Sequence, residues 1–200
     1  FLLGLGVSHA PIVEGIRKLN YSKPLSSMRQ YLEDMQNSPY TSIAPSAETP
    51  CVLAALGPKM LELAGEYTDG AHPSFTTPDH TAMAKEILGK NKLLCVEQKV
   101  VLTTNKEEAH EVARLAYSHH ASLPNYRNNW KRLGYTDEDI DQGTSRFIDA
   151  IVAWGTVDQV NARLAEHEDA GATHICIHPL NVKSKTEYTP LDTLEALAPR

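Results

Sequence analysis

Three of the nine histidines end or follow segments that have the composition of buried strands. His9 comes shortly after the apolar Phe1–Val7, His72 closes a short strand-like segment, and His178 ends Ala172–His178. Imidazole titrates near neutral pH, so each side chain could move a proton, contact a substrate or bind a metal ion. A polar residue that caps a turn is the competing interpretation for each, but the coincidence at three strand ends favours a functional role.

The remaining histidines are expected to be structural or to face solvent. His174 lies within a predicted strand, and we expect an interior residue with satisfied hydrogen bonds. A metal hydrolase is one function to weigh, but such barrels need a His-x-His pair on the first strand, and only His174, Cys176 and His178 resemble that pattern. We therefore expect no metal site. The histidines expected to face solvent from helices or loops are His80, His110, His119, His120 and His167.

The elements that would position these histidines are clearest between Pro50 and Pro73. The apolar run Cys51–Leu56 is typical of a buried strand, and it ends at Gly57-Pro58, where a turn residue precedes one that suits the first turn of a helix. Apolar residues then recur at helical spacing, and we expect Gly65 to end this helix. A second short strand is predicted from Asp69.

The connections in this strand–helix–strand unit are only a few residues long. Short connections of this kind favour two parallel strands with a right-handed crossover between them. Ligands of such units meet the carboxyl ends of the strands. Gly57, His72 and Pro73 are therefore expected to lie where a ligand binds.

Strand and helix patterns alternate along the rest of the chain. Five strands are predicted, each followed by helical residues, which is typical of a doubly wound sheet or a closed barrel. A complete (β/α)8 barrel takes about 250 residues. Five units in 200 residues fit the last five-eighths of such a barrel, a single partial domain over 1–200. Because the chain begins inside a strand, we expect the first three strands to be absent. The predicted strands are 1–7, 51–56, 69–72, 93–103 and 172–178.

The predicted helices include two regions where the pattern is less regular. The segment Leu123–Gly143 is expected to hold two short helices and to act as a lid over the strand ends. Its Tyr126, Trp130 and Tyr135 could line a pocket for an apolar substrate, or they could form a small core of their own. The segment Ser145–Trp154 is expected to be helical. The other predicted helices are about 23–35, 58–65, 78–88, 105–116, 156–170 and 191–197.

Composition excludes several classes of protein. The formal net charge is −6 and the sequence pI is about 5.8, with no basic stripe that would bind nucleic acid. No run approaches the ~18 consecutive apolar residues of a membrane span. Cys51, Cys95 and Cys176 are isolated in apolar runs, which is typical of reduced thiols in a cytoplasmic protein.

Two predicted strand ends consist of small residues. At Gly4–Ser8 and at Ala54–Gly57 a flat cofactor ring could approach the backbone closely. The alternative is that small residues simply let the interior layers of a barrel interdigitate. Gly4-x-Gly6 lacks the third glycine and the following helix of a dinucleotide-binding fingerprint, so a Rossmann domain is excluded.

Six segments together resemble the bacterial luciferase-like superfamily of flavin and deazaflavin enzymes, in particular its actinobacterial-type coenzyme F420-dependent oxidoreductases. They occur in order from Phe1 to about Leu180 without a large gap, so the resemblance covers most of the chain. The stretch from Ala54 to Pro73 is the most specific, followed by LPNYxxNxxRLGY. The segments are FLLGLGVSHAP, KPLSSMRQYLEDM, VLAALGPKMLELAGEYTDGAHP, TPDHTAMAKEILG, LPNYRNNWKRLGY and HEDAGATHICIHPL.

This resemblance implies a TIM-barrel enzyme that holds a deazaflavin, or less often FMN, at the C-terminal face. Hydride would pass between C5 of the cofactor and a small organic substrate. Val7 and Ser8 would lie along the cofactor ring. Four further residues would line the ring and side chain of the cofactor with their backbone: Ala54, Ala55, Leu56 and Gly57.

The resemblance also suggests roles for the strand-end histidines. His9 falls where some relatives carry an acidic proton donor, so it is the candidate catalytic acid or base. His72, Pro73 and His178 are expected to contact the substrate. In this superfamily the early strands supply a non-prolyl cis peptide and polar groups near the reacting carbon. Since we expect those strands to be absent, the chain alone should bind the cofactor poorly.

Two other functions remain open at this point. An FMN-dependent monooxygenase of the same fold would pass electrons to oxygen. A non-catalytic paralogue would bind deazaflavin without turnover. Relatives often form dimers, so a homodimer is a further expectation.

Overall fold

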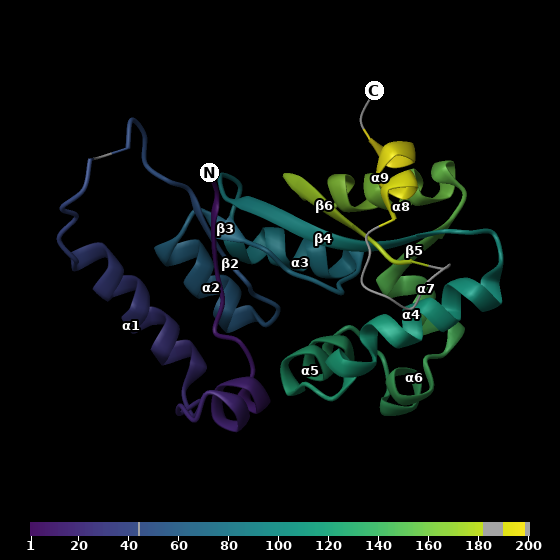
Figure 1. Ribbon diagram of the computed structural model, residues 1–200, viewed down its shortest axis with the longest axis horizontal. Helices are drawn as coiled ribbons and strands as arrows, with labels where there is room; N and C mark the ends of the chain where they lie inside the picture. Colours follow the sequence, from purple (N-terminus) through teal and green to yellow (C-terminus); the bar gives the residue numbers. More distant parts are fainter. Residues whose placement is uncertain (44, 182–189, 199–200) are drawn as a thin grey trace.

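The computed structural model describes residues 1–43, 45–181 and 190–198 of the chain. Within these ranges the strands are parallel and form one sheet of order β1-β2-β3-β4-β5, and β6 also pairs with β4 (Figure 1). The predicted parallel β/α architecture is confirmed, and the sheet is open in the described part of the chain. The strands are β1 (Leu3–Leu5), β2 (Cys51–Leu53), β3 (Gly70–Ala71), β4 (Leu93–Leu102), β5 (Val152–Gly155) and β6 (His174–Pro179).

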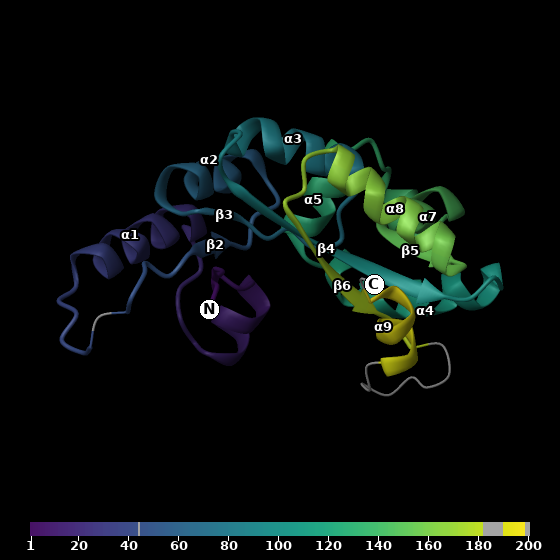
Figure 2. The ribbon, with the colours of Figure 1, turned by 90° about the horizontal axis from the view of Figure 1, so that it is seen from above.

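Helices connect the strands, and α1, α2, α3 and α8 follow one another along one side of the curved sheet (Figure 2). None of the described helices has both the length and the apolarity needed to cross a bilayer. The helical segments are the π-helix η1 (Pro11–Ile16), α1 (Pro24–Asn37), α2 (Pro58–Tyr67), α3 (Pro78–Leu88), α4 (Lys106–Ala121), α5 (Pro124–Arg132), α6 (Asp137–Gln142), α7 (Ser145–Ile151), α8 (Val157–Asp169) and α9 (Leu191–Leu197).

Several helix ends follow directly from the local sequence. Thr77, Asn105 and Thr136 are the N-caps of α3, α4 and α6, and the side-chain oxygen of each accepts a backbone N–H from the first turn. Gly89 ends α3 with φ 90°, a conformation that other residues adopt at a cost. These signals are local, which is why the helix starts match the sequence prediction closely.

Alternation along β4 separates the two faces of the sheet. Val96 is fully buried in the core that the sheet shares with α2 and α3. Gln98 faces the same side, because its Oε1 lies 2.8 Å from Nε2 of His167 on α8. Successive side chains of a strand point to opposite faces, so Glu97 and Lys99 lie on the other side. We call that side the inner face.

The register of the strands places polar residues in rows across the inner face. Glu97 on β4 pairs with Cys176 on β6, and Ser74, just after β3, forms a bridge with Glu97 from the other side. One row further along, Lys99 pairs with His178. Paired residues of neighbouring parallel strands share a face, as in the layered interior of a β/α barrel. The inner face therefore gathers Glu97, Lys99 and His178 near the carboxyl end of β6.

One strand was not predicted. The segment Ser145–Trp154 was expected to be helical throughout, but α7 ends at Ile151, and Val152–Gly155 pairs in parallel with Lys99–Leu102. The prediction was wrong because a short, continuously apolar run does not distinguish a helix from a buried strand. Tertiary pairing with β4 decides the structure here.

Gly65 does not end α2, contrary to the prediction. The helix continues to Tyr67, and a Cβ atom at Gly65 would lie 3.4 Å from the carbonyl oxygen of Leu88, the last residue of α3. Gly65 therefore allows α2 and α3 to approach each other closely, and it does not mark the end of α2.

Five histidines also differ from expectation, one of which is His120, expected to face solvent but half-buried with its Nδ1 inaccessible to solvent. His80, His110 and His167 were expected to face solvent but are 0%, 4% and 0% exposed, whereas His174 was expected inside and is exposed. Burial is possible because each buried ring has a hydrogen-bond partner. Nε2 of His80 lies 2.8 Å from the carbonyl oxygen of Leu56, and Nε2 of His110 lies 2.8 Å from Asp149.

The segment α5–α6 is held by two kinds of contact. Trp130 is fully buried, and its Nε1 donates a 2.9 Å hydrogen bond to the carbonyl oxygen of Phe75. It belongs to a core that includes Phe147 and that Tyr126 and Tyr135 pack against. The sequence left open whether these aromatic residues line a substrate pocket or form a small core. Trp130 and Tyr135 are part of the small core.

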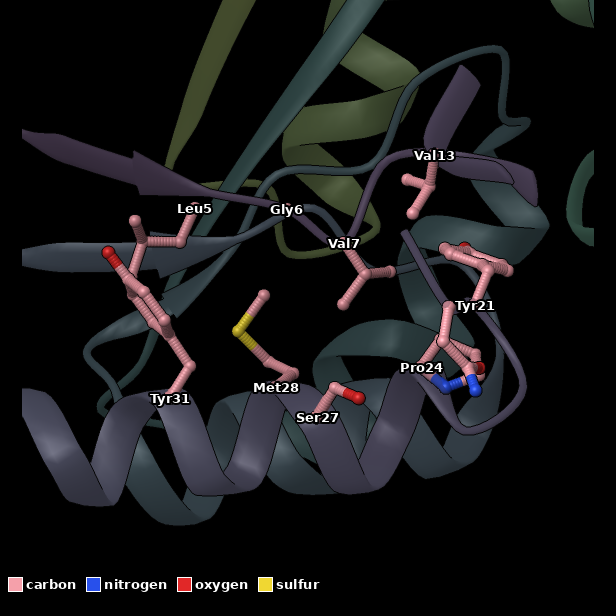
Figure 3. A pocket seen from close by; sticks show the side chains of 10 residues that line it. Leu5, Gly6, Val7, Val13, Tyr21, Pro24, Ser27, Met28 and Tyr31 are labelled. Carbon is pink, nitrogen blue, oxygen red and sulfur yellow. The ribbon is translucent and has the colours of Figure 1, made fainter. Parts of the chain in front are cut away.

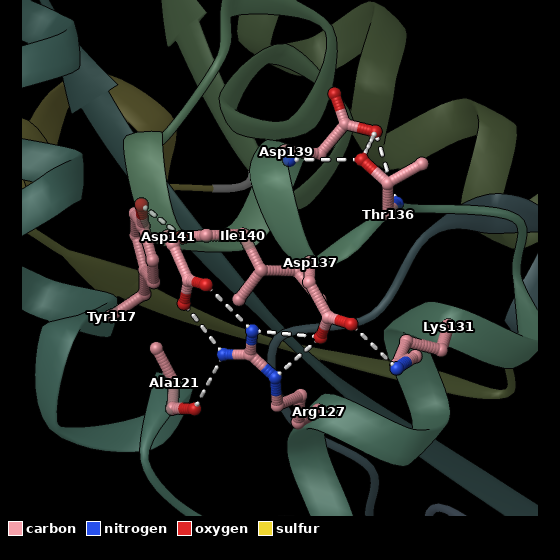
Figure 4. A network of polar contacts seen from close by, with 9 residues as sticks. All are labelled: Tyr117, Ala121, Arg127, Lys131, Thr136, Asp137, Asp139, Ile140 and Asp141. Atoms are coloured by element: carbon pink, nitrogen blue, oxygen red, sulfur yellow. Dashed lines mark hydrogen bonds and ion pairs between the residues drawn. The ribbon is translucent and has the colours of Figure 1, made fainter.

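A surface network fixes α6 relative to α5 (Figure 4). The guanidinium of Arg127 contacts the carboxylates of Asp137 and Asp141, each at 2.7 Å. Thr136 and Asp139 form a reciprocal capping box at the start of α6. This network closes the segment on its outer side, while Tyr126 on α5 is left facing the sheet.

Candidate functional site

An ionic cluster of Glu97, Lys99 and His178 occupies the inner face. Nδ1 of His178 lies 2.8 Å from Oε1 of Glu97 and 3.0 Å from Nζ of Lys99, and Lys99 also contacts the Glu97 carboxylate directly. The side chains of Lys99 and Glu97 are only 9% and 17% exposed, whereas that of His178 is 53% exposed. The cluster is thus a buried ion pair with an accessible imidazole above it.

The charges of this cluster fix the ionisation of Glu97. Burial alone would raise the pKa of Glu97, because a charged carboxylate is disfavoured in a low-dielectric environment. The hydrogen bond to His178, the positive charge and hydrogen bond of Lys99, and the hydrogen bond to Ser74 together outweigh burial. They hold the pKa of Glu97 far below its usual range, so Glu97 is a carboxylate at neutral pH.

Polar and aromatic contacts extend from the cluster to His9. Ser74 is a hydrogen-bond partner of both Glu97 and Tyr126. The rings of Tyr126 and His9 are 5.9 Å apart between centroids. Burial raises the pKa of the Tyr126 hydroxyl, so this group remains a neutral donor at neutral pH. Two of the three predicted histidines, His9 and His178, therefore lie at opposite ends of one set of contacts.

His9 has a strained and partly buried position. Ser8 before it has φ 60°, which is uncommon for a residue other than glycine, and its carbonyl oxygen accepts a 2.7 Å hydrogen bond from Tyr21. Burial, and then the nearby charge of His119, lower the pKa of His9, and a hydrogen bond with Asn125 opposes them. The imidazole is therefore neutral at neutral pH and can accept a proton.

Aromatic rings form the wall between His9 and Lys99. The ring of His120 lies 4.7 Å from that of Phe75 and 4.8 Å from that of Tyr126, between centroids. Nζ of Lys99 lies 4.8 Å from the centre of the Phe75 ring, a distance typical of a cation–π contact. Burial is the main cause that lowers the pKa of His120. The wall is apolar with neutral imidazoles, and Lys99 is the cation beside it.

His72 is placed differently from the other two predicted histidines. Its Nδ1 contacts the carbonyl oxygen of Cys95, and the carbonyl oxygen of Pro73 accepts a 2.9 Å hydrogen bond from the backbone N–H of Glu97. These contacts attach the chain after β3 to β4 and thereby position Ser74. The structure does not bring His72 into the ionic cluster.

The small residues at the ends of β1 and β2 face each other. A Cβ atom at Gly6 would lie 3.1 Å from Cβ of Ala54, so the two residues form a flat patch with little side chain. The backbone of Gly6 also borders a cavity of about 360 Å3, which Leu5 and Val7 line together with residues of α1 such as Met28 (Figure 3). Any contact of Val7 with a cofactor on the inner face would therefore use its backbone.

The end of β2 leads into a positively charged corner. The side chains of Ala55 and Leu56 are buried, so these residues offer mainly backbone, and the carbonyl oxygen of Leu56 is already bonded to His80. At Gly57, the N-cap of α2, a Cβ atom would lie 3.8 Å from Nη2 of Arg132. Pro58 has no N–H, and the N–H groups of Met60 and Leu61 already bond the carbonyl oxygen of Gly57, so the guanidinium of Arg132 is the group in this corner that suits an anion.

Asn129 adds an unused donor near this corner. Its Oδ1 accepts a 3.1 Å hydrogen bond from Arg132, while its Nδ2 is buried without a hydrogen-bond partner among the described residues. A buried amide that lacks a partner costs free energy, so such a group favours a bound acceptor. This corner thus has a cation and a spare donor.

A family model described as luciferase-like monooxygenase matches residues 1–174. The chain belongs to the luciferase-like monooxygenase family. A relative from Mycobacterium tuberculosis, described as a coenzyme F420-dependent oxidoreductase (Rv3520c), is 26% identical over 240 residues. That alignment covers 88% of this chain and 69% of the relative. The resemblance inferred from the sequence is therefore confirmed at the level of the family.

Solved structures agree on the luciferase-like fold. An F420-dependent secondary alcohol dehydrogenase in complex with an F420-acetone adduct has a TM-score of 0.65 at 14% identity, covering 89% of this chain and 63% of that one. The coenzyme F420-dependent tetrahydromethanopterin reductase of Methanopyrus kandleri has a TM-score of 0.60 at 16% identity, covering 89% and 67%. The chain thus spans about two thirds of the length of these luciferase-like proteins.

Several residues of this luciferase-like site were not found from the sequence. Glu97 and Lys99 were missed, although two charged residues spaced two apart within an apolar strand indicate one polar face. Asn129 and Arg132 were also missed; they belong to the segment LPNYxxNxxRLGY, which was interpreted as a lid and in which Tyr126 was already named as a possible pocket residue. Within the described ranges, no three His, Cys, Asp or Glu side chains are arranged to hold a metal ion.

Proposed function

We propose that this chain is part of a coenzyme F420-dependent oxidoreductase that transfers a hydride between the deazaflavin and a small organic substrate. The observation that carries the proposal is the flat patch of Gly6 and Ala54 at the ends of β1 and β2, in a chain whose sheet also carries the acid/base groups His9 and His178 near strand ends. The comparisons support this proposal, because the Mycobacterium relative and two of the similar structures are named as F420-dependent.

The residues present fit a flat, anionic cofactor. The small patch would accept one face of a ring, and the backbone of Val7, Ser8 and the stretch from Ala54 to Gly57 would line it. Arg132 would hold a negatively charged part of the molecule, with Nδ2 of Asn129 as a further donor. When bound, the deazaflavin supplies the carbon that accepts or gives the hydride.

The chain's own groups would then handle protons and solvent. His9 is neutral at neutral pH because burial lowers its pKa, so it is suited to accept a proton on the side of β1. His72, Pro73 and His178 would border the substrate. The aromatic wall of Phe75, His120 and Tyr126 would exclude water from the reacting atoms.

One specific observation favours a second candidate, an FMN-dependent monooxygenase. The family model that matches the chain is itself described as a monooxygenase. A deazaflavin-binding paralogue without turnover is a third candidate. We further propose a cytoplasmic location, consistent with the three free cysteines, and a homodimer as in other family members.

A fluorescence titration with oxidised F420, with FMN in parallel, tests this function. Saturable binding of F420 but not FMN supports the proposal, even if the affinity is low. Binding of FMN alone moves the chain to the monooxygenase class, which oxygen consumption with a reduced-flavin supply would check. Absence of binding by either cofactor would overturn the proposal for this chain.

A further inference from the structure

The pairing of Glu97 with His178 resembles the arrangement in which a carboxylate orients a catalytic imidazole. The carboxylate is buried and ionised, and its Oε1 lies 2.8 Å from Nδ1 of His178. A carboxylate is a stronger acceptor than any neutral group nearby, so the proton of a neutral imidazole is expected on Nδ1. Nζ of Lys99 lies 3.0 Å from the same Nδ1 and can only donate, so it competes for a lone pair on that nitrogen. Glu97 is the nearer group and also binds Lys99, which favours the carboxylate as the partner of Nδ1.

This tautomer leaves the other ring nitrogen as a proton acceptor. With hydrogen on Nδ1, Nε2 of His178 carries a lone pair, and the side chain is 53% exposed. His9, by comparison, has Asn125 and His119 as its polar neighbours and no carboxylate partner among the contacts found for it. An imidazolium formed at His178 would be attracted by Glu97 at 2.8 Å and repelled by Lys99 at 3.0 Å, and Lys99 is itself paired with Glu97, whereas one formed at His9 would face another histidine.

We propose that His178, oriented by Glu97, is the acid/base residue that exchanges a proton with the oxygen of an alcohol or carbonyl substrate. This inference rests on the proposed function and adds the residue and the substrate class. Glu97 is a positioning residue, and Lys99 keeps it ionised.

The charge of the cluster selects this substrate class. The charges of Glu97 and Lys99 cancel, so this pair places no net charge beneath the imidazole. Nζ of Lys99, only 3.0 Å from the ring, disfavours a cationic amine and favours an oxygen that becomes more negative during reaction. An alcohol or its carbonyl product carries no positive charge, and its oxygen becomes more negative during the reaction.

The reaction balances without another reactant. In the oxidative direction the carbinol C–H bond breaks and its electron pair leaves with the hydrogen for the oxidised deazaflavin. The O–H bond breaks, its proton passes to Nε2 of His178, and the carbonyl double bond forms. The imidazolium then releases the proton to solvent through its exposed edge. The reverse sequence reduces a carbonyl group.

The tautomer of His178 can be measured without any cofactor. Nitrogen-15 NMR of histidine-labelled chain, assigned with His178→Gln, is expected to show hydrogen on Nδ1 and a bare Nε2 in the wild-type chain. Glu97→Gln should remove this preference. Because Glu97→Gln leaves Lys99 buried without its counter-charge, the double variant Glu97→Gln/Lys99→Met provides a second test in a neutral cluster. A proton on Nε2 in the wild-type chain would overturn the proposed orientation.

Turnover tests the substrate class, with 2-propanol and benzyl alcohol as probes and oxidised F420 as acceptor. His178→Gln should lower kcat by about 100-fold, a typical contribution of a general base, with F420 affinity unchanged. His174→Gln, on the same strand but outside the cluster, should keep wild-type kcat. An F420-binding chain that oxidises neither alcohol contradicts the substrate class. A chain that does not bind F420 contradicts the proposed function, and the NMR result then decides the Glu97–His178 pairing separately.

Discussion

Gln98 on β4 determines which nitrogen of His167 on α8 carries hydrogen. The amide nitrogen of Gln98 donates to the carbonyl oxygens of Lys99 and Ile151, so its Oε1 must be the acceptor that lies 2.8 Å from Nε2 of His167. Nδ1 is then the acceptor for the hydroxyl of Thr81, also at 2.8 Å. The neutral ring is fully satisfied, and it joins α8, α3 and β4 behind the inner face.

This arrangement predicts a loss of stability in mild acid. Burial, with the charge of Arg163 and then of His80, lowers the pKa of His167 from 6.5 to about 4. The unfolded chain therefore binds a proton below about pH 6.5, whereas the folded chain does so only near pH 4. The free energy of unfolding should fall by about 3 kcal/mol over this interval because of His167. Urea unfolding at a series of pH values measures the slope.

His167→Gln isolates this contribution from that of other titrating groups. The variant should be less stable at neutral pH, and its stability should fall less steeply between pH 6.5 and 4 than that of the wild-type chain. His174→Gln, at an exposed position, should keep the wild-type slope. Equal slopes for His167→Gln and the wild-type chain would show that the ring is not held neutral.

Gly70 in β3 is predicted to tolerate no side chain. A Cβ atom there would overlap the carbonyl oxygen of Leu93 and lie 2.6 Å from its carbonyl carbon, so the backbone of β4 would have to move. Gly70→Ala should lower the free energy of unfolding by about 3 kcal/mol, the upper part of the range for overpacking. It should also displace His72 and Ser74. Gly4→Ala in β1, where no atom lies within 4 Å, is the matched control and should be nearly neutral.

The ionic cluster predicts that removing Lys99 alone lowers the free energy of unfolding more than removing the charges of both Glu97 and Lys99. Lys99→Met leaves the Glu97 carboxylate buried without its cation, and removal of one partner of a buried pair costs about 3 to 5 kcal/mol. Glu97→Gln/Lys99→Met should recover most of this stability. Denaturant unfolding at neutral pH compares the two, and a double variant as unstable as Lys99→Met would contradict the electrostatic explanation.

The pH dependence of the free energy of unfolding also tests whether Lys99 keeps Glu97 ionised. The pKa of Glu97 is depressed in the folded chain, so its contribution to stability is complete above the ordinary pKa of glutamate and is lost as the pH falls below it. In Lys99→Met the depression should be smaller, and the contribution should be lost at higher pH. An unchanged acid transition would contradict the role of Lys99 in keeping Glu97 ionised.

Sequence patterns were sufficient for local features and insufficient for pairings across the sheet. The caps at Thr77, Asn105 and Thr136 depend on residues three positions apart, so they could be predicted. The pairing of Glu97 with His178 joins residues 81 positions apart through the register of β4 and β6, which no local pattern specifies. The place of His178 at a strand end could thus be predicted from the sequence, while its carboxylate partner could not.

The buried histidines show a second limit. His80 and His167 lie on helices whose polar residues usually face solvent, and their burial depends on the carbonyl group of Leu56, after β2, and the amide group of Gln98 on β4. Such partners are determined by packing, not by the helical sequence. The same reason explains the missed strand at Val152–Gly155, which is a strand only because Lys99–Leu102 is beside it.

The charged corner at Gly57 predicts how cofactor affinity depends on Arg132. If an anionic part of F420 lies at the start of α2, Arg132→Gln should raise the dissociation constant of F420 by about tenfold, the effect of one charge-assisted hydrogen bond. The loss should shrink at high salt, because salt screens an exposed guanidinium. Arg146→Gln is the matched control, since that guanidinium pairs with Asp139 on the far side of α6 and its side chain is 59% exposed. Equal affinity of Arg132→Gln and the wild-type chain would place the anionic part elsewhere.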